Sequence, residues 1–150
     1  MRRNRLPALL ALAATLAAVA APGAMAAATA PSAAPKAPPV LTMKTGNLGV
    51  VVATKKKLGL YTWNAEKDFK VRCTGACAEK WPPVLLMKGE KVKAMVAGIK
   101  GEFGTVRRPD GSTQLTLNRQ PVYTYHGDSA GIVLCDNVDG WFAVRAAGKA

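Results

Sequence analysis

The sequence has few of the residues on which most enzymes depend. Its 150 residues include a single histidine, His126, and nine acidic residues, which are scattered through turn-like segments. It contains no Gly-x-Ser-x-Gly motif for a nucleophilic serine and no glycine-rich loop for binding phosphate. We therefore predict a non-enzymatic protein that uses no cofactor.

The one long apolar run is too short and too rich in alanine for a membrane span. It covers residues 6–21, follows three arginines, and ends before the small residues Ala24 and Ala26. This order of charged, apolar and small residues is typical of a signal peptide rather than of a retained anchor helix. We predict that residues 1–26 are cleaved off, that the mature protein is exported to the periplasm or secreted, and that no transmembrane segment remains.

Acidic residues are scarce relative to basic ones. Without residues 1–26, the chain has 18 Lys and Arg against nine Asp and Glu, a formal net charge of +9. Such a balance favours anionic partners such as lipid headgroups or envelope polymers, whereas export argues against nucleic acid. The basic clusters, which are either anion contacts or solvated turns, are Lys55, Lys56 and Lys57, and Arg107 with Arg108.

Residues 27–40 lack bulky side chains and apolar periodicity, because they are mainly Ala, Pro, Ser and Thr. We predict a disordered linker there and a single small domain over residues 41–150. All nine aromatic residues lie between residues 60 and 143, which places the core in this domain.

The remaining pattern predicts an all-β, mainly antiparallel domain with one short helix. Runs rich in β-branched and aromatic residues predict strands at 49–53, 60–63, 104–107, 113–117, 121–125 and 141–144. The Asp110-Gly111 pair predicts a tight hairpin. A short helix is expected over residues 76–80, ending at Trp81 because two prolines follow.

A weak internal duplication runs through these elements. Leu48-Gly49 leads to Tyr61 and Phe103-Gly104 leads to Tyr123, at Gly-to-Tyr distances of 12 and 19 residues. A longer hairpin in the second half would account for the difference. We predict two pseudo-symmetric units, at about residues 46–87 and 101–146, with Trp81 and Trp141 packing against the strands of their own units.

Four segments of the chain carry a resemblance to a known family. LYTWNAEKD, CTGACAEKWPP, FGTVRRPDGSTQLTLNRQPVYTYHGD and DGWFAV resemble, in that order, a bacterial family described as a secreted repeat of unknown function. Its members are often described as predicted lipoproteins with a Tyr-x-aromatic-x-x-Asp motif. The resemblance covers about residues 46–145 and implies an envelope location and a repeat domain, with no established activity. This chain has no cysteine before Cys73, so the lipid anchor is not implied.

The motif occurs twice. Its residues are Tyr61, Trp63 and Glu66 in the first copy, and Tyr123, Tyr125 and Asp128 in the second. Because side chains two apart on a strand share a face, the two aromatic residues of each copy form a pair. The acid then falls in the following turn, where it can accept bonds from backbone N–H groups or a tyrosine hydroxyl. The pairs are either core residues or, if exposed, a platform for stacking a sugar or quinone.

Cysteine is scarce, and its spacing favours a structural role. Cys73 and Cys77 are four residues apart with Gly75 between them, so we predict that they form a disulfide in the exported protein and leave Cys135 unpaired. The spacing differs from the Cys-x-x-Cys of thiol oxidoreductases and haem attachment sites.

We predict an exported envelope or secreted module that binds an anionic envelope component. The alternatives are a thiol-redox protein and a periplasmic metal-binding or electron-transfer protein. The latter would draw ligands from His126 and Cys135, together with methionines. A turn histidine and a buried cysteine are the simpler interpretation of these two residues.

Overall fold

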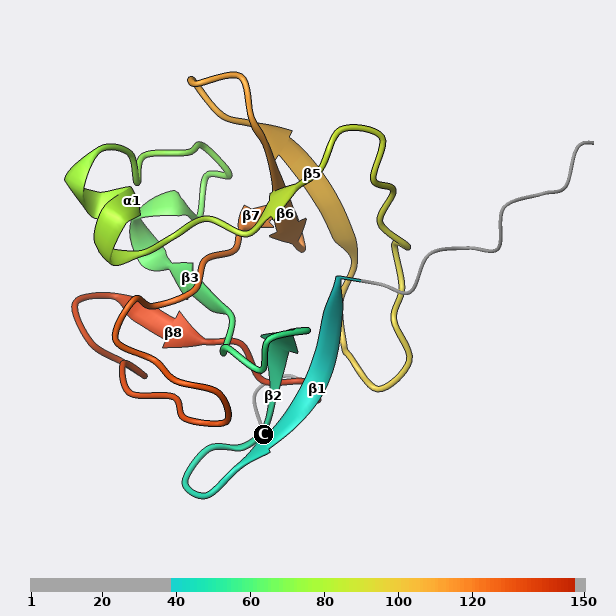
Figure 1. The fold of residues 1–150 in the computed structure, drawn as a ribbon, viewed down its shortest axis with the longest axis vertical. Helices are drawn as coiled ribbons and strands as arrows, with labels where there is room; N and C mark the ends of the chain where they lie inside the picture. The colour runs from blue at the N-terminus through green and yellow to red at the C-terminus, as the bar shows by residue number, and fades with distance from the viewer. Residues whose placement is uncertain (1–38, 148–150) are drawn as a thin grey trace, which may run out of the picture. The chain divides into compact units, whose positions relative to one another are not determined.

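A computed structural model describes residues 39–147. The predicted signal peptide and almost all of the predicted linker lie outside this range. The strands are β1 (Val40–Thr45), β2 (Gly49–Thr54), β3 (Tyr61–Trp63), β4 (Leu85–Leu86), β5 (Phe103–Arg107), β6 (Thr113–Leu117), β7 (Gln120–Pro121) and β8 (Trp141–Ala143). The helices are a 3-10 turn, η1 (Asn64–Glu66), and α1 (Ala76–Lys80) (Figure 1). Strand β1 begins at Val40, which is buried, so the domain starts one residue before the predicted boundary.

The strands pair in antiparallel fashion throughout the described residues. β1 pairs with β2, β3 with β8, and β6 with β4, β5 and β7. The short helix α1 covers the predicted residues and lies beside the cysteine turn. The prediction of a mainly antiparallel β domain with one short helix is therefore confirmed.

Two pseudo-symmetric repeats meet at a pair of tyrosines. The hairpin β1–β2 corresponds to β5–β6, because Leu60 N donates to Val52 O (2.8 Å) just as Val122 N donates to Leu115 O (3.1 Å). At the centre, Tyr61 N donates to Tyr123 O (2.8 Å) and Tyr123 N donates to Tyr61 O (2.9 Å). Two equivalent residues that exchange both backbone bonds define an antiparallel pair. A local two-fold axis therefore passes between the tyrosines.

The alignment of the repeats differs from the predicted one. The strand registers make Leu41 in β1 equivalent to Gly104 in β5, and both repeats contain a hairpin. Leu41 lies 20 residues before Tyr61 and Gly104 lies 19 residues before Tyr123. The predicted alignment of Gly49 with Gly104, and the longer second hairpin inferred from it, were therefore wrong, because Gly49 lies in β2 and Gly104 lies in β5, the counterpart of β1. The first repeat starts near residue 40 rather than 46.

The repeats are interleaved, and each gives a segment to the other. β8 pairs with β3, and Val52 N donates to Val144 O (2.8 Å), so the last segment of the second repeat joins strands of the first. Reciprocally, β4 pairs with β6, and Leu115 N donates to Val84 O (2.8 Å). The segments that follow Trp81 and Trp141 thus pair with strands of the opposite repeat. The two tryptophan rings nevertheless contact the tyrosines of their own repeats, Trp81 with Tyr61 and Trp141 with Tyr123, as predicted.

Both repeats also contribute to each of two apolar clusters. The first cluster is aromatic and contains Tyr61, Tyr123, Trp81 and Trp141. The second cluster is aliphatic apart from Phe103, and its residues include Val52, Leu60, Leu115 and Val122. Because each cluster draws side chains from both repeats, neither repeat has a core of its own.

Candidate functional site

The two copies of the motif exchange their hydrogen bonds. Tyr61 and Tyr123 are fully buried beside the local axis. The Tyr61 hydroxyl donates to Asp128 Oδ2 (2.7 Å), and the Tyr123 hydroxyl donates to Glu66 Oε2 (2.8 Å). The tyrosine of each copy therefore pairs with the acid of the other, a partnership that the sequence alone did not indicate.

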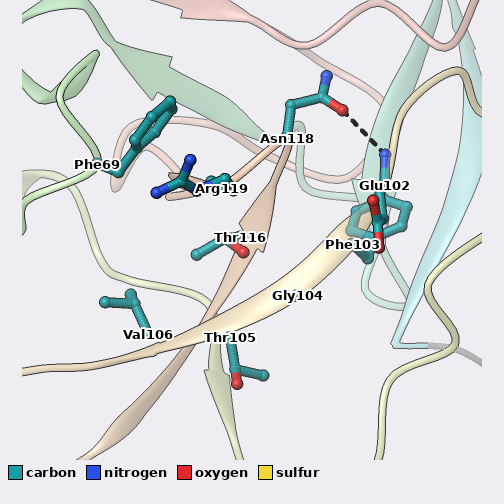
Figure 2. Close-up of a pocket in the computed structure, with 9 residues that line it drawn as sticks. All are labelled: Phe69, Glu102, Phe103, Gly104, Thr105, Val106, Thr116, Asn118 and Arg119. Atoms are coloured by element: carbon teal, nitrogen blue, oxygen red, sulfur yellow. Dashed lines mark hydrogen bonds between the residues drawn. The ribbon is translucent and has the colours of Figure 1, made fainter.

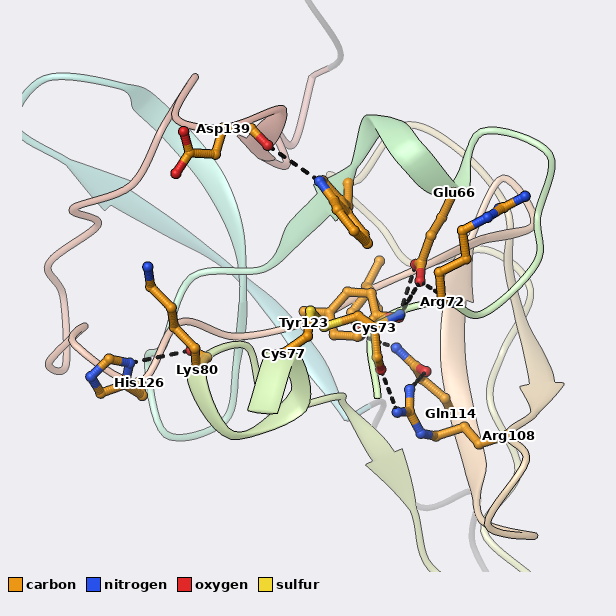
Figure 3. Close-up of a disulfide and its surroundings, with 12 residues drawn as sticks. Glu66, Arg72, Cys73, Cys77, Lys80, Arg108, Gln114, Tyr123, His126 and Asp139 are labelled. Atoms are coloured by element: carbon orange, nitrogen blue, oxygen red, sulfur yellow. Dashed lines mark hydrogen bonds between the residues drawn. A yellow bond between two sulfur atoms is a disulfide. The ribbon is translucent and has the colours of Figure 1, made fainter. Parts of the chain in front are cut away.

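The same acids hold the loops that follow them. Glu66 Oε1 accepts bonds from Arg72 N (2.6 Å) and Cys73 N (2.9 Å), as Figure 3 shows. Asp128 Oδ1 accepts a bond from Leu134 N (3.0 Å), six residues further along the chain, as Arg72 is from Glu66. Glu66 and Asp128 thus accept the same kinds of hydrogen bond, from a tyrosine hydroxyl and from the backbone of the following loop. The motif therefore fixes the contact between the two repeats.

Burial keeps the hydroxyl groups of Tyr61 and Tyr123 neutral. It raises the pKa of both Tyr61 and Tyr123 well above the ordinary value, and the carboxylates of Asp128 and Glu66 raise these pKa values further. Burial also raises the pKa of Asp128, against the opposing effect of the bond from Tyr61. Both hydroxyls are therefore fixed as hydrogen-bond donors to the acids.

Four aromatic rings form a column that alternates between the repeats. Its order is Trp63, Trp141, Trp81 and Tyr125, with successive centroid distances of 5.2, 4.0 and 4.7 Å. The two inner tryptophans are buried and the two outer rings are half-buried. Tyr61 and Tyr123 meet the inner tryptophans edge-on. The column is mainly core, which favours the structural interpretation of these aromatic residues.

The disulfide forms as predicted. Cys73 and Cys77 are bonded, with their Cα atoms 5.1 Å apart, just before and within α1. Among the described residues, Cys135 is the free cysteine, and it is half-buried. It stands seven residues after Asp128, as Cys73 does after Glu66, so the two cysteines are equivalent in the repeats. The interaction with Cys135 raises the pKa of Tyr125.

Arg108 is not a surface cation, which corrects its prediction as an anion contact. It is buried, and its guanidinium donates to Cys73 O (2.7 Å) and to Gln114 Oε1 (Figure 3). Gln114 Nε2 in turn donates to Val122 O (2.8 Å). The Arg108 Nε lies 3.7 Å from Asp110 Oδ2, and the two terminal nitrogens of Arg108 join the disulfide loop to the second repeat.

The lysine cluster lies on an exposed turn between β2 and β3. Lys55, Lys56 and Lys57 are all exposed. The turn is held by bonds from Lys57 N to Thr54 O (2.8 Å) and from Gly131 N to Lys57 O (2.9 Å). Its counterpart in the second repeat is the turn between β6 and β7, whereas Arg107 ends β5. The two predicted basic clusters therefore do not occupy equivalent loops.

The candidate metal ligands His126 and Cys135 do not form a common site. His126 is exposed, with Nδ1 3.3 Å from Lys80 O, and Cys135 packs against the aromatic cluster. Within the part of the chain that the structure describes, no group of three or more His, Cys, Asp or Glu side chains could hold a metal ion.

A groove that the sequence analysis did not single out is lined by strands β5 and β6, Phe69 and Arg119. The only sequence signal was Asn118-Arg119, where an Asn-Gly pair is usual for a tight turn. Across residues 39–147, no helix has the length and apolar character needed to cross a membrane.

Comparison with known proteins identifies the repeats. A family model described as a secreted repeat of unknown function matches residues 42–85 and residues 104–145. These segments coincide with the two structural repeats, which confirms the resemblance found in the sequence. Neither the curated proteins nor the solved structures gave a match. The chain belongs to this family of secreted repeats.

Proposed function

We propose that this member of the secreted-repeat family is a non-catalytic exported module that binds an anionic component of the cell envelope. The observation that carries the proposal is the unequal placement of acidic and basic side chains. The described residues contain 16 Lys and Arg against nine Asp and Glu, a formal net charge of +7.

Most of the acids are engaged within the fold. Glu66 and Asp128 bind the buried tyrosine hydroxyls, and three further acids form ion pairs with arginines. These pairs are Asp68 with Arg72, Asp110 with Arg108, and Asp136 with Arg145. The other 13 basic residues are all exposed, and only four acids are left to balance them. The surface is therefore more basic than the net charge suggests.

The lysine turn is the densest part of this surface. Three consecutive exposed lysines stand on a turn whose backbone is tied to β2 and to Gly131. A fixed turn presents its charges without the ordering cost that a flexible segment would incur on binding. Association with a polyanion should weaken as salt rises, because exposed charges are screened over about 8 Å at physiological ionic strength.

Co-sedimentation tests this proposal. The mature protein is mixed with vesicles containing phosphatidylglycerol, or with a phosphate-bearing cell-wall polymer, at low and high salt. The variant K55Q/K56Q/K57Q should lose at least tenfold in affinity at low salt. The matched variant K88Q/K91Q/K93Q removes three exposed lysines elsewhere and should lose much less. Equal losses would show a diffuse charge effect, and no binding by the unmodified protein would overturn the proposal.

A further inference from the structure

The groove between Phe69 and strand β5 has the features of a binding site for a small ligand. Its volume is about 650 Å³, within the range of about 300–1,000 Å³ that is usual for such sites. Figure 2 shows Phe69 and Arg119 side by side at one end, with Glu102 and Asn118 at the other. Gly104, Val106 and Thr116, from β5 and β6, also line the groove.

The groove exists because one repeat lacks side chains that the other has. By strand register, Gly104 and Val106 stand where the first repeat has Leu41 and Met43. Leu41 and Met43 pack with the aromatic cluster. The same face is therefore filled in the first repeat and hollow in the second. An unfilled space of this kind costs packing contacts between apolar side chains. We take this cost as a sign that the groove has a function.

The two side chains at the groove's end stand at positions that favour glycine. Phe69 has φ of 68° and lies eight residues after Tyr61. The equivalent residue, eight after Tyr123, is Gly131 with φ of 88°. A large side chain in this left-handed region is strained, whereas glycine is not. The chain accepts this strain in one repeat only, at the residue that faces the groove.

Arg119 also stands at a position that favours glycine. Asn118 and Arg119 both have positive φ, 49° and 69°, in the two-residue turn between β6 and β7. Glycine is usual at the second position of such a turn. The Arg119 guanidinium lies over one face of the Phe69 ring, 4.3 Å from its centroid, so the two strained residues contact each other. Phe69 is 37% exposed and Arg119 is exposed, so the pair is open to a ligand.

The charged side chains that line the groove, Arg119 and Glu102, determine which ligands it favours. Arg119 is well suited to a carboxylate, which it can bind through two parallel N–H bonds. Asn118 Oδ1 accepts a bond from Glu102 N (2.9 Å), which fixes the amide against the Glu102 backbone, and both side chains line the groove (Figure 2). These groups can exchange hydrogen bonds with hydroxyls. Because Glu102 repels a second anion, the groove favours a ligand with one acidic group over a polyphosphate.

We propose that this groove binds an acidic sugar residue. The apolar face of the sugar ring stacks on the part of Phe69 that Arg119 leaves exposed, its carboxylate pairs with Arg119, and its hydroxyls bond to Asn118 and Glu102. The electron-rich face of an aromatic ring attracts the partly positive C–H groups of a sugar. This site goes beyond the proposed function, because it uses none of the three turn lysines.

Titration followed by NMR tests the proposal. A tetrasaccharide of alternating glucuronate and N-acetylglucosamine is added to the ¹⁵N-labelled mature protein at 150 mM salt, with neutral chitotetraose as the matched control. The acidic ligand should shift the amide signals of Gly104, Asn118 and Arg119 and bind at least tenfold more tightly. Equal binding of the neutral sugar, or shifts confined to other parts of the domain, would overturn the proposal.

Variants taken from the other repeat sharpen the test. Phe69→Gly should reduce affinity at least tenfold and leave the Tm unchanged or raised, because strain is relieved. Val106→Met refills the groove with the first repeat's residue and should also block binding. It is preferred to a change at Gly104, where an added Cβ would lie 3.1 Å from Thr116 Oγ1.

Two arginine variants separate the role of the charge from its location. Arg119→Asn removes the charge with a residue that tolerates positive φ, and should weaken binding at least tenfold. Arg107→Gln removes an exposed arginine of β5 that does not line the groove, and should change affinity less than twofold. Unaltered binding by the Phe69 or Arg119 variant would contradict the proposal. K55Q/K56Q/K57Q should bind the tetrasaccharide normally, so this site and the lysine turn can fail independently.

Discussion

Each motif is half of a site that the other motif completes. Tyr61 and Tyr123 form an isolated antiparallel bridge, and each hydroxyl donates to the acid of the opposite repeat. The shared face of the aromatic residues and the bonding role of the acid could be predicted from strand geometry and turn chemistry. The partner of each acid could not, because it depends on how strands 62 residues apart align.

The buried tyrosines should make the protein sensitive to alkali. Their pKa values are raised in the folded state, so the stability that they confer is present below the unfolded tyrosine pKa of about 10 and is lost as pH rises above it. Each tyrosine should lower the free energy of unfolding by about 1.4 kcal/mol per pH unit there. Urea denaturation at pH 7, 10 and 11 measures this slope.

The double variant Tyr61→Phe/Tyr123→Phe isolates these two groups. It should be less stable at pH 7 by about 1–3 kcal/mol, because both acids lose a donor, and its stability should fall less steeply above pH 10. Tyr125→Phe keeps both buried hydroxyls and serves as the control. Parallel pH profiles for the double variant and the unmodified protein would show that the two tyrosines are not protected from ionisation.

Strong local signals explain which elements could be predicted. Strand β6 and helix α1 occupy the predicted residues, because an Asp-Gly turn marks the start of one and paired prolines mark the end of the other. Strand β1 was missed because its sequence directly follows a proline-rich segment. The predicted strand over residues 121–125 is reduced to β7 and isolated bridges, because Tyr123 pairs with Tyr61 and Pro83 rather than with one continuous strand.

The disulfide should stabilise the loop that enters α1 by a modest amount. Closing so short a loop is worth about 2 kcal/mol on the loop-entropy model. A reductant should therefore lower the free energy of unfolding of the unmodified protein by about that amount and leave Cys73→Ala/Cys77→Ala unchanged. Urea denaturation with and without dithiothreitol provides the measurement.

Cys135→Ser is the control for this disulfide. It should keep the full response to reductant, because Cys135 stands apart from the Cys73–Cys77 bond. A response that disappears in the Cys135 variant would instead indicate a bridge between the repeats.

At the scale of the whole domain, the duplication serves to build one core from two incomplete halves. The duplication could be predicted from the sequence, but the interleaving of the repeats could not. A hydrophobic pattern indicates which face of a strand is buried, but it does not indicate which repeat covers that face. The stacked Trp81 and Trp141, the exchanged tyrosine bonds, and the pairing of β4 with β6 and of β3 with β8 all cross between repeats. Most of the specific packing therefore exists only when both repeats are present.

This interleaving predicts that the repeats fold together or not at all. Fragments of residues 27–89 and 90–150, divided in the exposed segment after β4, should each be largely unfolded alone as monomers. Mixed at equal concentration, they should regain the far-ultraviolet circular dichroism of the intact protein and the near-ultraviolet signal of the stacked tryptophans. The apolar surface and paired strands that each lacks are supplied by the other. Cooperative unfolding of either fragment as a monomer would show that a repeat has its own core, contrary to the strand pairing seen here.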